Sequence, residues 1–226
     1  MIKRLFNFLN PVLQPLAKLY FNKPRSFHYL GIKGVVLPDV FHPQLTISTK
    51  LLMEFIDKLE LKGKSLLELG CGTGFISTLA AKKGAKVLAS DINPKAIENT
   101  MLNVKKNEVN VEVLLSDLFE KTPNQLFDFI IINPPYYPKN PKSIAENAWY
   151  CGADFEYFKR LFPQLLTYQN DYSKIYMILS EDCELQIIKD LAAIHRFDFE
   201  LVLETKRQGE WNYIFRIQQP AKSKAI

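Results

Sequence analysis

Short apolar segments alternate with amphipathic segments from about residue 48 onward. Apolar runs of strand length, bounded by turn residues, predict seven strands. These strands cover residues 65–69, 86–91, 111–115, 127–132, 175–179, 198–204 and 211–217. Apolar residues at helical spacing predict helices over about 48–59, 75–83, 94–106, 154–166 and 184–195. Ser48 or Thr49 is the expected cap of the first helix, and Asn93 with Pro94 is expected to open the third.

The order of these elements predicts the fold class. Strands that alternate with helices of 10–15 residues form βαβ units around a parallel sheet. The last two strands are joined only by a short link containing Gln208 and Gly209, so they must form an antiparallel hairpin. We therefore expect an α/β fold with a mostly parallel seven-stranded sheet, an antiparallel closing strand and helices on both faces.

Composition excludes several classes of protein. The chain has 226 residues, of which 47% are hydrophobic and 23% charged, as in globular proteins and unlike disordered ones. No apolar run approaches the roughly 20 residues of a membrane-spanning helix. The three cysteines, Cys71, Cys151 and Cys183, have neither zinc-site nor disulfide-framework spacing. We expect reduced thiols, no metal and a cytoplasmic protein that does not bind membranes.

The excess positive charge lies in one place. Residues 1–38 contain six basic residues and no acidic residue, whereas the rest of the chain carries 23 basic and 24 acidic residues. We define residues 1–42 as a basic N-terminal arm, in which Asn7, Asn10 and Pro11 interrupt the apolar pattern too early for a secretory signal. A helical arm packed on the core is the first interpretation and a surface for nucleic acid the second, and a membrane-surface helix is the least favoured of the three.

A glycine-rich turn follows the first predicted strand. Gly70, Gly72 and Gly74 stand at a strand-to-helix junction, where glycine permits a tight turn and close approach of a ligand. Glu68 precedes the turn. Asp91 ends the second strand, where a carboxylate can accept both hydroxyls of a ribose. An NAD site is the rival interpretation, but the G-x-G-x-x-G order is missing and no hydride-transfer site is evident.

A second motif follows the fourth strand, at the edge of the sheet where ligands of open α/β folds bind. It consists of Asn133, Pro134, Pro135 and Tyr136. The Asn133 side-chain oxygen and the Pro134 carbonyl can accept both hydrogens of a planar NH2 group, which localises the nitrogen lone pair toward a methyl donor. Tyr136 can stack on the planar group, so catalysis would rest on alignment and electrostatics.

These residues resemble the S-adenosylmethionine site of the Rossmann-like (class I) methyltransferases. The resemblance implies that Glu68 helps to hold the methionine end of the cofactor. It also implies that Asp91 binds the ribose and that Asp117, after the third strand, binds the adenine amino group. The reversed strand in an otherwise parallel sheet is likewise a feature of that family.

The NPPY tetrapeptide resembles the signature of methyltransferases that act on planar nitrogens. Over residues 43–217 the chain is most similar to the release-factor glutamine N5-methyltransferases and small RNA methyltransferases. Only 64 residues precede the first predicted strand, fewer than the bacterial glutamine enzymes use for their N-terminal helical domain and its linker. The resemblance implies protein glutamine N5-methylation first and RNA base methylation, at adenine N6 or guanine N2, as the alternative.

The remaining expectations concern partners and segments. The substrate is expected to be a release-factor-like protein or an RNA, and no DNA substrate is expected because no segment is long enough for a target-recognition domain. We expect a methyltransferase domain over residues 43–219, a disordered tail over 220–226, and either a substrate lid or a plain loop over 137–142. The sequence leaves the oligomeric state open.

Overall fold

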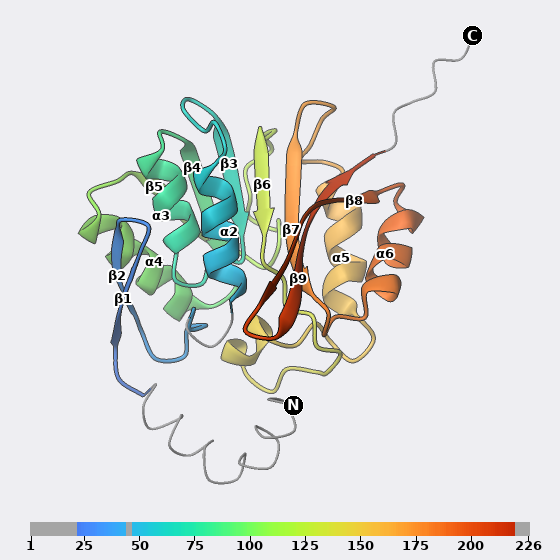
Figure 1. Ribbon diagram of the computed structural model, residues 1–226, viewed down its shortest axis with the longest axis horizontal. Coiled ribbons are helices and arrows are strands. Elements are labelled where there is room, and N and C mark those ends of the chain that lie inside the picture. The colour runs from blue at the N-terminus through green and yellow to red at the C-terminus, as the bar shows by residue number, and fades with distance from the viewer. Residues whose placement is uncertain (1–21, 44–46, 220–226) are drawn as a thin grey trace.

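A seven-stranded sheet forms the centre of the structure, a computed structural model that describes residues 22–43 and 47–219 (Figure 1). Its strands are β3 (Ser65–Leu69), β4 (Lys86–Asp91), β5 (Val111–Leu115), β6 (Phe129–Ile132), β7 (Lys174–Ser180), β8 (Asp198–Arg207) and β9 (Glu210–Gln218). They lie in the order β5-β4-β3-β6-β7-β9-β8, and β9 runs antiparallel to the other six strands of this sheet. The predicted α/β fold with one reversed closing strand is confirmed.

Helices cover both faces of this sheet (Figure 1). They are α2 (Ser48–Asp57), α3 (Phe75–Lys82), α4 (Pro94–Lys106), α5 (Glu156–Leu165) and α6 (Leu185–Ile194), with the short 3-10 helix η1 (Ile144–Ala148). Their bounds agree with the predicted helices to within about two residues. In the part of the chain that the structure describes, no helix is long and apolar enough to cross a bilayer.

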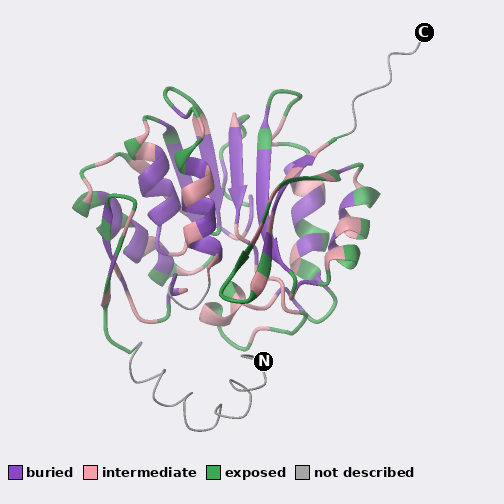
Figure 2. Ribbon diagram, in the orientation of Figure 1, coloured by how far each residue is buried: buried purple, intermediate pink, exposed green. Residues whose placement is uncertain are grey.

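Two cores lie on opposite faces of the sheet because successive side chains of a strand point to opposite faces. Leu66 and Ile131 belong to the core that contains α2, α3 and α4, whereas Leu67 and Ile130 belong to the core that contains α5 and α6. All four side chains are completely buried. The central strands β3 and β6 are therefore buried on both faces along almost their whole length, as Figure 2 shows, and do not alternate between buried and exposed positions.

A hairpin that the sequence did not predict precedes the main sheet. It consists of β1 (Arg25–Tyr29) and β2 (Ile32–Val36), which pair antiparallel. Leu30 and Gly31 connect them with φ values of 45° and 73°, the left-handed conformation that two-residue hairpin turns require. This hairpin lies within the predicted basic arm, whereas residues 1–21 of that arm and the predicted tail, residues 220–226, lie outside the described residues.

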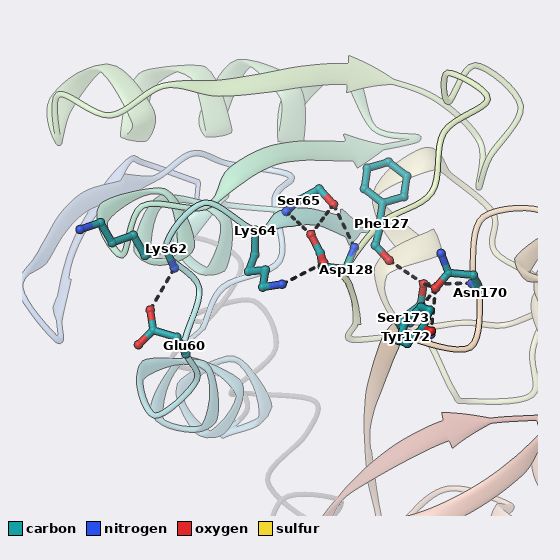
Figure 3. A network of polar contacts seen from close by, with 9 residues as sticks. All are labelled: Glu60, Lys62, Lys64, Ser65, Phe127, Asp128, Asn170, Tyr172 and Ser173. Carbon is teal, nitrogen blue, oxygen red and sulfur yellow. Dashed lines mark hydrogen bonds and ion pairs between the residues drawn. The ribbon is translucent and has the colours of Figure 1, made fainter.

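Polar contacts fasten the amino-terminal ends of three central strands (Figure 3). The Asp128 carboxylate accepts hydrogen bonds from the Ser65 N–H at 2.9 Å and from the Ser65 hydroxyl at 3.0 Å. The Ser173 hydroxyl donates to the Phe127 carbonyl at 2.7 Å. The backbone bond from Ser65 is the main reason why the pKa of Asp128 is lowered. This end of the sheet is fixed by charge-assisted bonds, while the opposite end is left to form the site.

Candidate active site

The carboxyl ends of four neighbouring strands, β5, β4, β3 and β6, meet at one edge of the sheet. The chain runs outward through β3, β4 and β5 and then returns to β6 on the other side of β3, which makes this edge the topological switch point. A cavity of about 390 Å³ lies here, and all the predicted site residues except Gly74 line it. Leu69 pairs with Ile132, so Gly70 and Asn133 leave the sheet side by side.

The glycine turn is held by hydrogen bonds from several elements. Gly70 N–H and Cys71 N–H both donate to the Ser90 carbonyl at 2.8 Å. Gly70 and Gly72 have positive φ values of 81° and 53°. A Cβ added at either position would meet no protein atom within 4 Å. The space beside both glycines therefore opens into the cavity, where a ligand can approach the backbone closely.

Gly74 has a different role from the other two glycines. It does not line the cavity, and a Cβ there would lie 2.5 Å from Thr100 Cγ2. Its φ of 70° places it in the left-handed region at the start of α3. Gly74 thus permits close packing of α3 against α4.

Glu68 is a buried acid at the base of the cavity, with 4% of its surface exposed. Its Oε2 accepts hydrogen bonds from Ser77 N–H, at 2.8 Å, and from the Ser77 hydroxyl. Burial raises the pKa of Glu68 to about 8, although both Ser77 bonds act in the opposite direction. A cation placed beside a buried carboxyl group favours its ionised form and lowers its pKa.

Asp91 connects the glycine turn to the start of α4. Its Oδ2 accepts from Gly72 N–H at 2.8 Å, and its Oδ1 accepts from Asn93 N–H at 2.8 Å. Burial raises its pKa, and the two backbone bonds lower it in part. The Asn93 side chain in turn accepts from Lys95 N–H at 2.9 Å, which confirms the predicted start of this helix at Asn93 and Pro94.

Asp117 has a partner that the sequence did not indicate. Arg160, on α5, donates from Nη2 to Asp117 Oδ2 at 2.7 Å, and both residues line the cavity. Arg160 also lies 3.6 Å from a Glu120 carboxylate oxygen. The arginine fixes the orientation of Asp117 through one oxygen of its carboxylate.

Asn133 forms a hydrogen bond with Ser48, and both residues line the cavity. Its Nδ2 donates to Ser48 Oγ at 3.3 Å, which orients the amide and leaves Oδ1 as its acceptor atom. The predicted cap of α2 is wrong: the capping position is Ile47, and no side chain forms a cap hydrogen bond there. Ser48 and Thr49 are instead buried residues of the first turn that line the cavity. No sequence motif connected Ser48 to the site.

Tyr136, the last residue of the NPPY motif, contacts residues outside the motif. Its hydroxyl forms a hydrogen bond with Ser180, and burial raises its pKa far above the usual range. Its ring lies 4.8 Å from the ring of Tyr137, measured between centroids. Pro134 and Pro135 line the cavity between Asn133 and this fixed ring.

The segment after the motif forms a wall of the cavity. Tyr137 N–H donates to the Trp149 carbonyl at 3.1 Å, and Cys151 N–H donates to the Tyr137 carbonyl at 3.0 Å. These bonds close the neck of a loop whose residues Asn140, Ile144 and Trp149 line the cavity. The Trp149 ring lies 4.8 Å from that of Phe41, which comes from the chain after the N-terminal hairpin. Residues 137–142, for which the sequence left a substrate lid and a plain loop open, therefore begin a wall whose neck is closed by backbone hydrogen bonds.

Comparisons with known proteins agree with this geometry. The family described as methyltransferase small domain matches residues 32–148, slightly more than half of the chain. A protein of Methanocaldococcus jannaschii that is provisionally named protein N5-glutamine methyltransferase is 45% identical over 109 residues, covering 48% of this chain and 53% of that protein. Ribosomal RNA small subunit methyltransferase C of Haemophilus influenzae is 34% identical over 152 residues, covering 60% of this chain and 45% of that protein.

A third relative is the ribosomal protein L11 methyltransferase of Thermosipho melanesiensis, which is 40% identical over 112 residues. That match covers 48% of this chain and 43% of the relative. The chain thus spans about half the length of the curated relatives it matches.

Two solved structures share the fold. The T. thermophilus 16S rRNA N2 G1207 methyltransferase, in complex with AdoMet and guanosine, has a TM-score of 0.66 and 17% identity. The match covers 88% of this chain and 50% of that one. The E. cuniculi Mtq2–Trm112 complex, responsible for methylation of the eRF1 termination factor, has a TM-score of 0.59 and 19% identity over 80% of this chain and 99% of that one.

Proposed function

This chain belongs to the methyltransferase small domain family, and from that premise we propose that it methylates the side-chain N5 of glutamine in a protein. Membership in the family confirms the predicted enzyme class and its cofactor, S-adenosylmethionine. The observation that carries the proposal of a planar nitrogen target is the position of Asn133 and Pro134. They leave the sheet beside the glycine turn and line the same cavity.

The residues that line the cavity support binding of S-adenosylmethionine in the arrangement that the sequence predicts. The open space beside Gly70 and Gly72 suits a ligand in contact with the backbone. We assign the ribose hydroxyls to Asp91, the adenine amino group to Asp117 Oδ1 and the methionine ammonium to Glu68. When bound, the cofactor supplies a methyl group made electrophilic by its sulfonium sulfur.

The chain's own contribution is to orient the acceptor nitrogen. An amide nitrogen is a poor nucleophile because its lone pair is delocalised into the carbonyl group. Asn133 Oδ1 and the Pro134 carbonyl would accept the two N–H hydrogens and hold the lone pair toward the methyl group. In the transfer the N–C bond would form as the S–C bond of the sulfonium breaks, which would leave S-adenosylhomocysteine, and the surplus N–H proton would pass to solvent. Alignment and electrostatics thus account for the rate.

The fixed surroundings of these acceptors support this role. Ser48 holds the amide of Asn133 at 3.3 Å, and Tyr136 is anchored by Ser180. Preorganised acceptors require no rearrangement when charge develops, and this is the condition under which they accelerate a reaction most.

The choice of glutamine rests on the relative with 45% identity, whose name specifies protein N5-glutamine methylation. The Mtq2–Trm112 complex shares the fold and methylates a termination factor, and this likeness supports the proposal of a release-factor-like substrate. RNA base methylation is the second candidate, because the relative that covers most of this chain among those above acts on ribosomal RNA. The six positive charges without an acid in residues 1–38 also favour RNA.

Methyl transfer into a cell extract separates the two substrates. Labelled S-adenosylmethionine is incubated with extract and either the wild-type chain or Asn133→Ala, and the products are divided between protease and RNase treatment. We expect label that protease releases, which peptide mapping then locates on glutamine. Label that only RNase releases would replace the proposal with RNA methylation. Equal labelling by Asn133→Ala would refute the role of the motif.

A further inference from the structure

Four asparagines, two within α4 and one at each of its caps, bind consecutive odd-numbered residues of the N-terminal segment. We call this set the asparagine ladder. Its members and their main-chain partners are Asn107 with Lys33, Asn103 with Val35, Asn99 with Leu37, and Asn93 with Asp39. In the first three pairs the asparagine Oδ1 accepts the strand N–H at 2.8–3.1 Å. The helix thereby supplies the hydrogen bonds that a further strand would give to the outer edge of β2.

The spacing of the ladder follows from the geometry of the two elements. Four residues of an α-helix advance about 6 Å, and two residues of a strand advance about 6.7 Å. Asparagines at positions 99, 103 and 107 therefore stay in register with every second residue of an antiparallel segment. Asparagine is a poor helix former, and this series lies on the side of α4 where Asn99 and Asn103 are completely buried.

Asn103 differs from the other members because it also binds the glycine turn. Its Nδ2 donates to the Val35 carbonyl and to the Thr73 carbonyl, both at 2.9 Å. One turn earlier on α4, the Thr100 hydroxyl donates to the Gly72 carbonyl at 3.2 Å. The turn carbonyls are thus held by the same helix that holds the hairpin.

The far end of the ladder leads into the cavity. Asn99 Oδ1 accepts from Leu37 N–H at 2.8 Å, and Asn93 Nδ2 donates to the Asp39 carbonyl at 2.9 Å. Val40 and Phe41 follow immediately and line the cavity, where the Phe41 ring lies 4.8 Å from the ring of Trp149. The ladder therefore determines where this part of the cavity wall lies.

We propose that Asn103 is a positioning residue that couples the N-terminal hairpin to the glycine turn, so that the hairpin helps to build the S-adenosylmethionine site. This rests on the cofactor assignment above. Asn103 is not expected to touch the cofactor. It acts by fixing the Thr73 carbonyl and the strand that leads to Val40 and Phe41.

Calorimetric titration with S-adenosylhomocysteine tests the coupling. Asn107→Ala is the matched control, because Asn107 is in the same ladder and binds Lys33 but not the glycine turn. We expect Asn103→Ala to weaken binding about tenfold and Asn107→Ala to weaken it less than twofold. At saturating S-adenosylmethionine, kcat of Asn103→Ala should remain within twofold of wild type while its KM for the cofactor rises. A general loss of structure would not produce this separation.

A second variant approaches the same contact from the hairpin. A Cβ on Gly34 would lie 2.2 Å from Phe75 Cε1 and 2.8 Å from Asn103 Oδ1, so Gly34→Ala must shift β2 or these two side chains and thereby disturb the contact between β2 and Asn103. It should weaken cofactor binding as Asn103→Ala does. If Asn103→Ala fails to fold, this variant carries the test alone.

The outcomes distinguish the two proposals. Wild-type affinity in both Asn103→Ala and Gly34→Ala would overturn the coupling and leave the cofactor assignment intact. An equal loss in Asn107→Ala would also overturn it, because the glycine turn would then have no special part. Absence of binding by the wild-type chain would refute the cofactor assignment and the coupling with it.

Discussion

Glu68 provides a quantitative test of the site in the absence of any substrate. The substitution Glu68→Gln replaces a buried carboxyl group by a neutral group of the same shape that can still accept from Ser77 N–H. It therefore removes the ionisation while it keeps the main contact. Glu112→Gln, at an exposed position of β5, is a matched control for loss of one acidic group.

The expected pH dependence follows from the pKa of Glu68, which rises from 4.5 to about 8 on folding. Between these values the folded state binds more protons than the unfolded state, so stability falls as pH rises. This contribution is complete below the ordinary pKa and is lost as pH passes through the raised one. Each pH unit in this interval lowers the free energy of unfolding by about 1.4 kcal/mol. From pH 5.5 to 7.5 the loss is at most about 2.7 kcal/mol.

The assay is urea unfolding of the wild type and both variants at pH 5.5, 6.5 and 7.5. We expect Glu68→Gln to gain about 2–2.5 kcal/mol relative to wild type across this range. In a chain of this size, each kcal/mol corresponds to about 2–4 °C in Tm. A constant difference between wild type and Glu68→Gln would refute the buried, protonated state of this carboxyl group. Glu112→Gln should follow the wild type at every pH.

Three further substitutions test the other parts of the account. Asn133→Ala should lower kcat at least a hundredfold and leave the calorimetric Kd for S-adenosylhomocysteine within threefold, and a near-normal kcat would contradict the proposed mechanism. Asp91→Ala should weaken S-adenosylhomocysteine binding at least tenfold in the same titration, and an unchanged Kd would separate Asp91 from the ribose. Asp128→Ala should lower the free energy of unfolding by about 1–3 kcal/mol in urea, because Ser65 N–H loses its acceptor. Its cofactor affinity should equal that of wild type, since Asp128 lies at the opposite edge of the sheet.

The sequence predicted the main sheet well because the relevant signals are local. Buried strands in this fold are short apolar runs, and each is followed by a helix with its own amphipathic pattern. The glycine turn after β3 and the NPPY motif after β6 could be assigned to the same edge because parallel strands all end there. Their adjacency in the sheet, with Leu69 paired to Ile132, is what the structure adds.

Contacts between distant segments could not be predicted in this way. Ser48 looks like a helix cap in the sequence, and only the folded chain brings it to Asn133, 85 residues away. The pairing of Arg160 with Asp117 likewise depends on how α5 packs against the sheet. Gly74 belongs to the same glycine series as Gly70, but close packing against Thr100 determines its role.

The N-terminal hairpin was missed although the sequence contains signals for it. Leu30 and Gly31 form a two-residue turn between short segments with buried Phe27 and Ile32. The asparagines at 99, 103 and 107 recur every fourth residue of a predicted helix, a pattern that apolar periodicity does not register. The basic charge of residues 1–38 indicated a separate arm and not a hairpin that packs on α4. The domain boundary at residue 42 stays a prediction.

A crystal structure with S-adenosylmethionine bound is the most direct test of the central claim, which is the identity and orientation of this site. We predict that the ribose hydroxyls contact the Asp91 carboxylate beside the glycine turn and that the sulfonium methyl group faces Asn133 Oδ1. A cofactor bound outside the cavity, or one whose methyl group points away from the NPPY motif, would contradict the account.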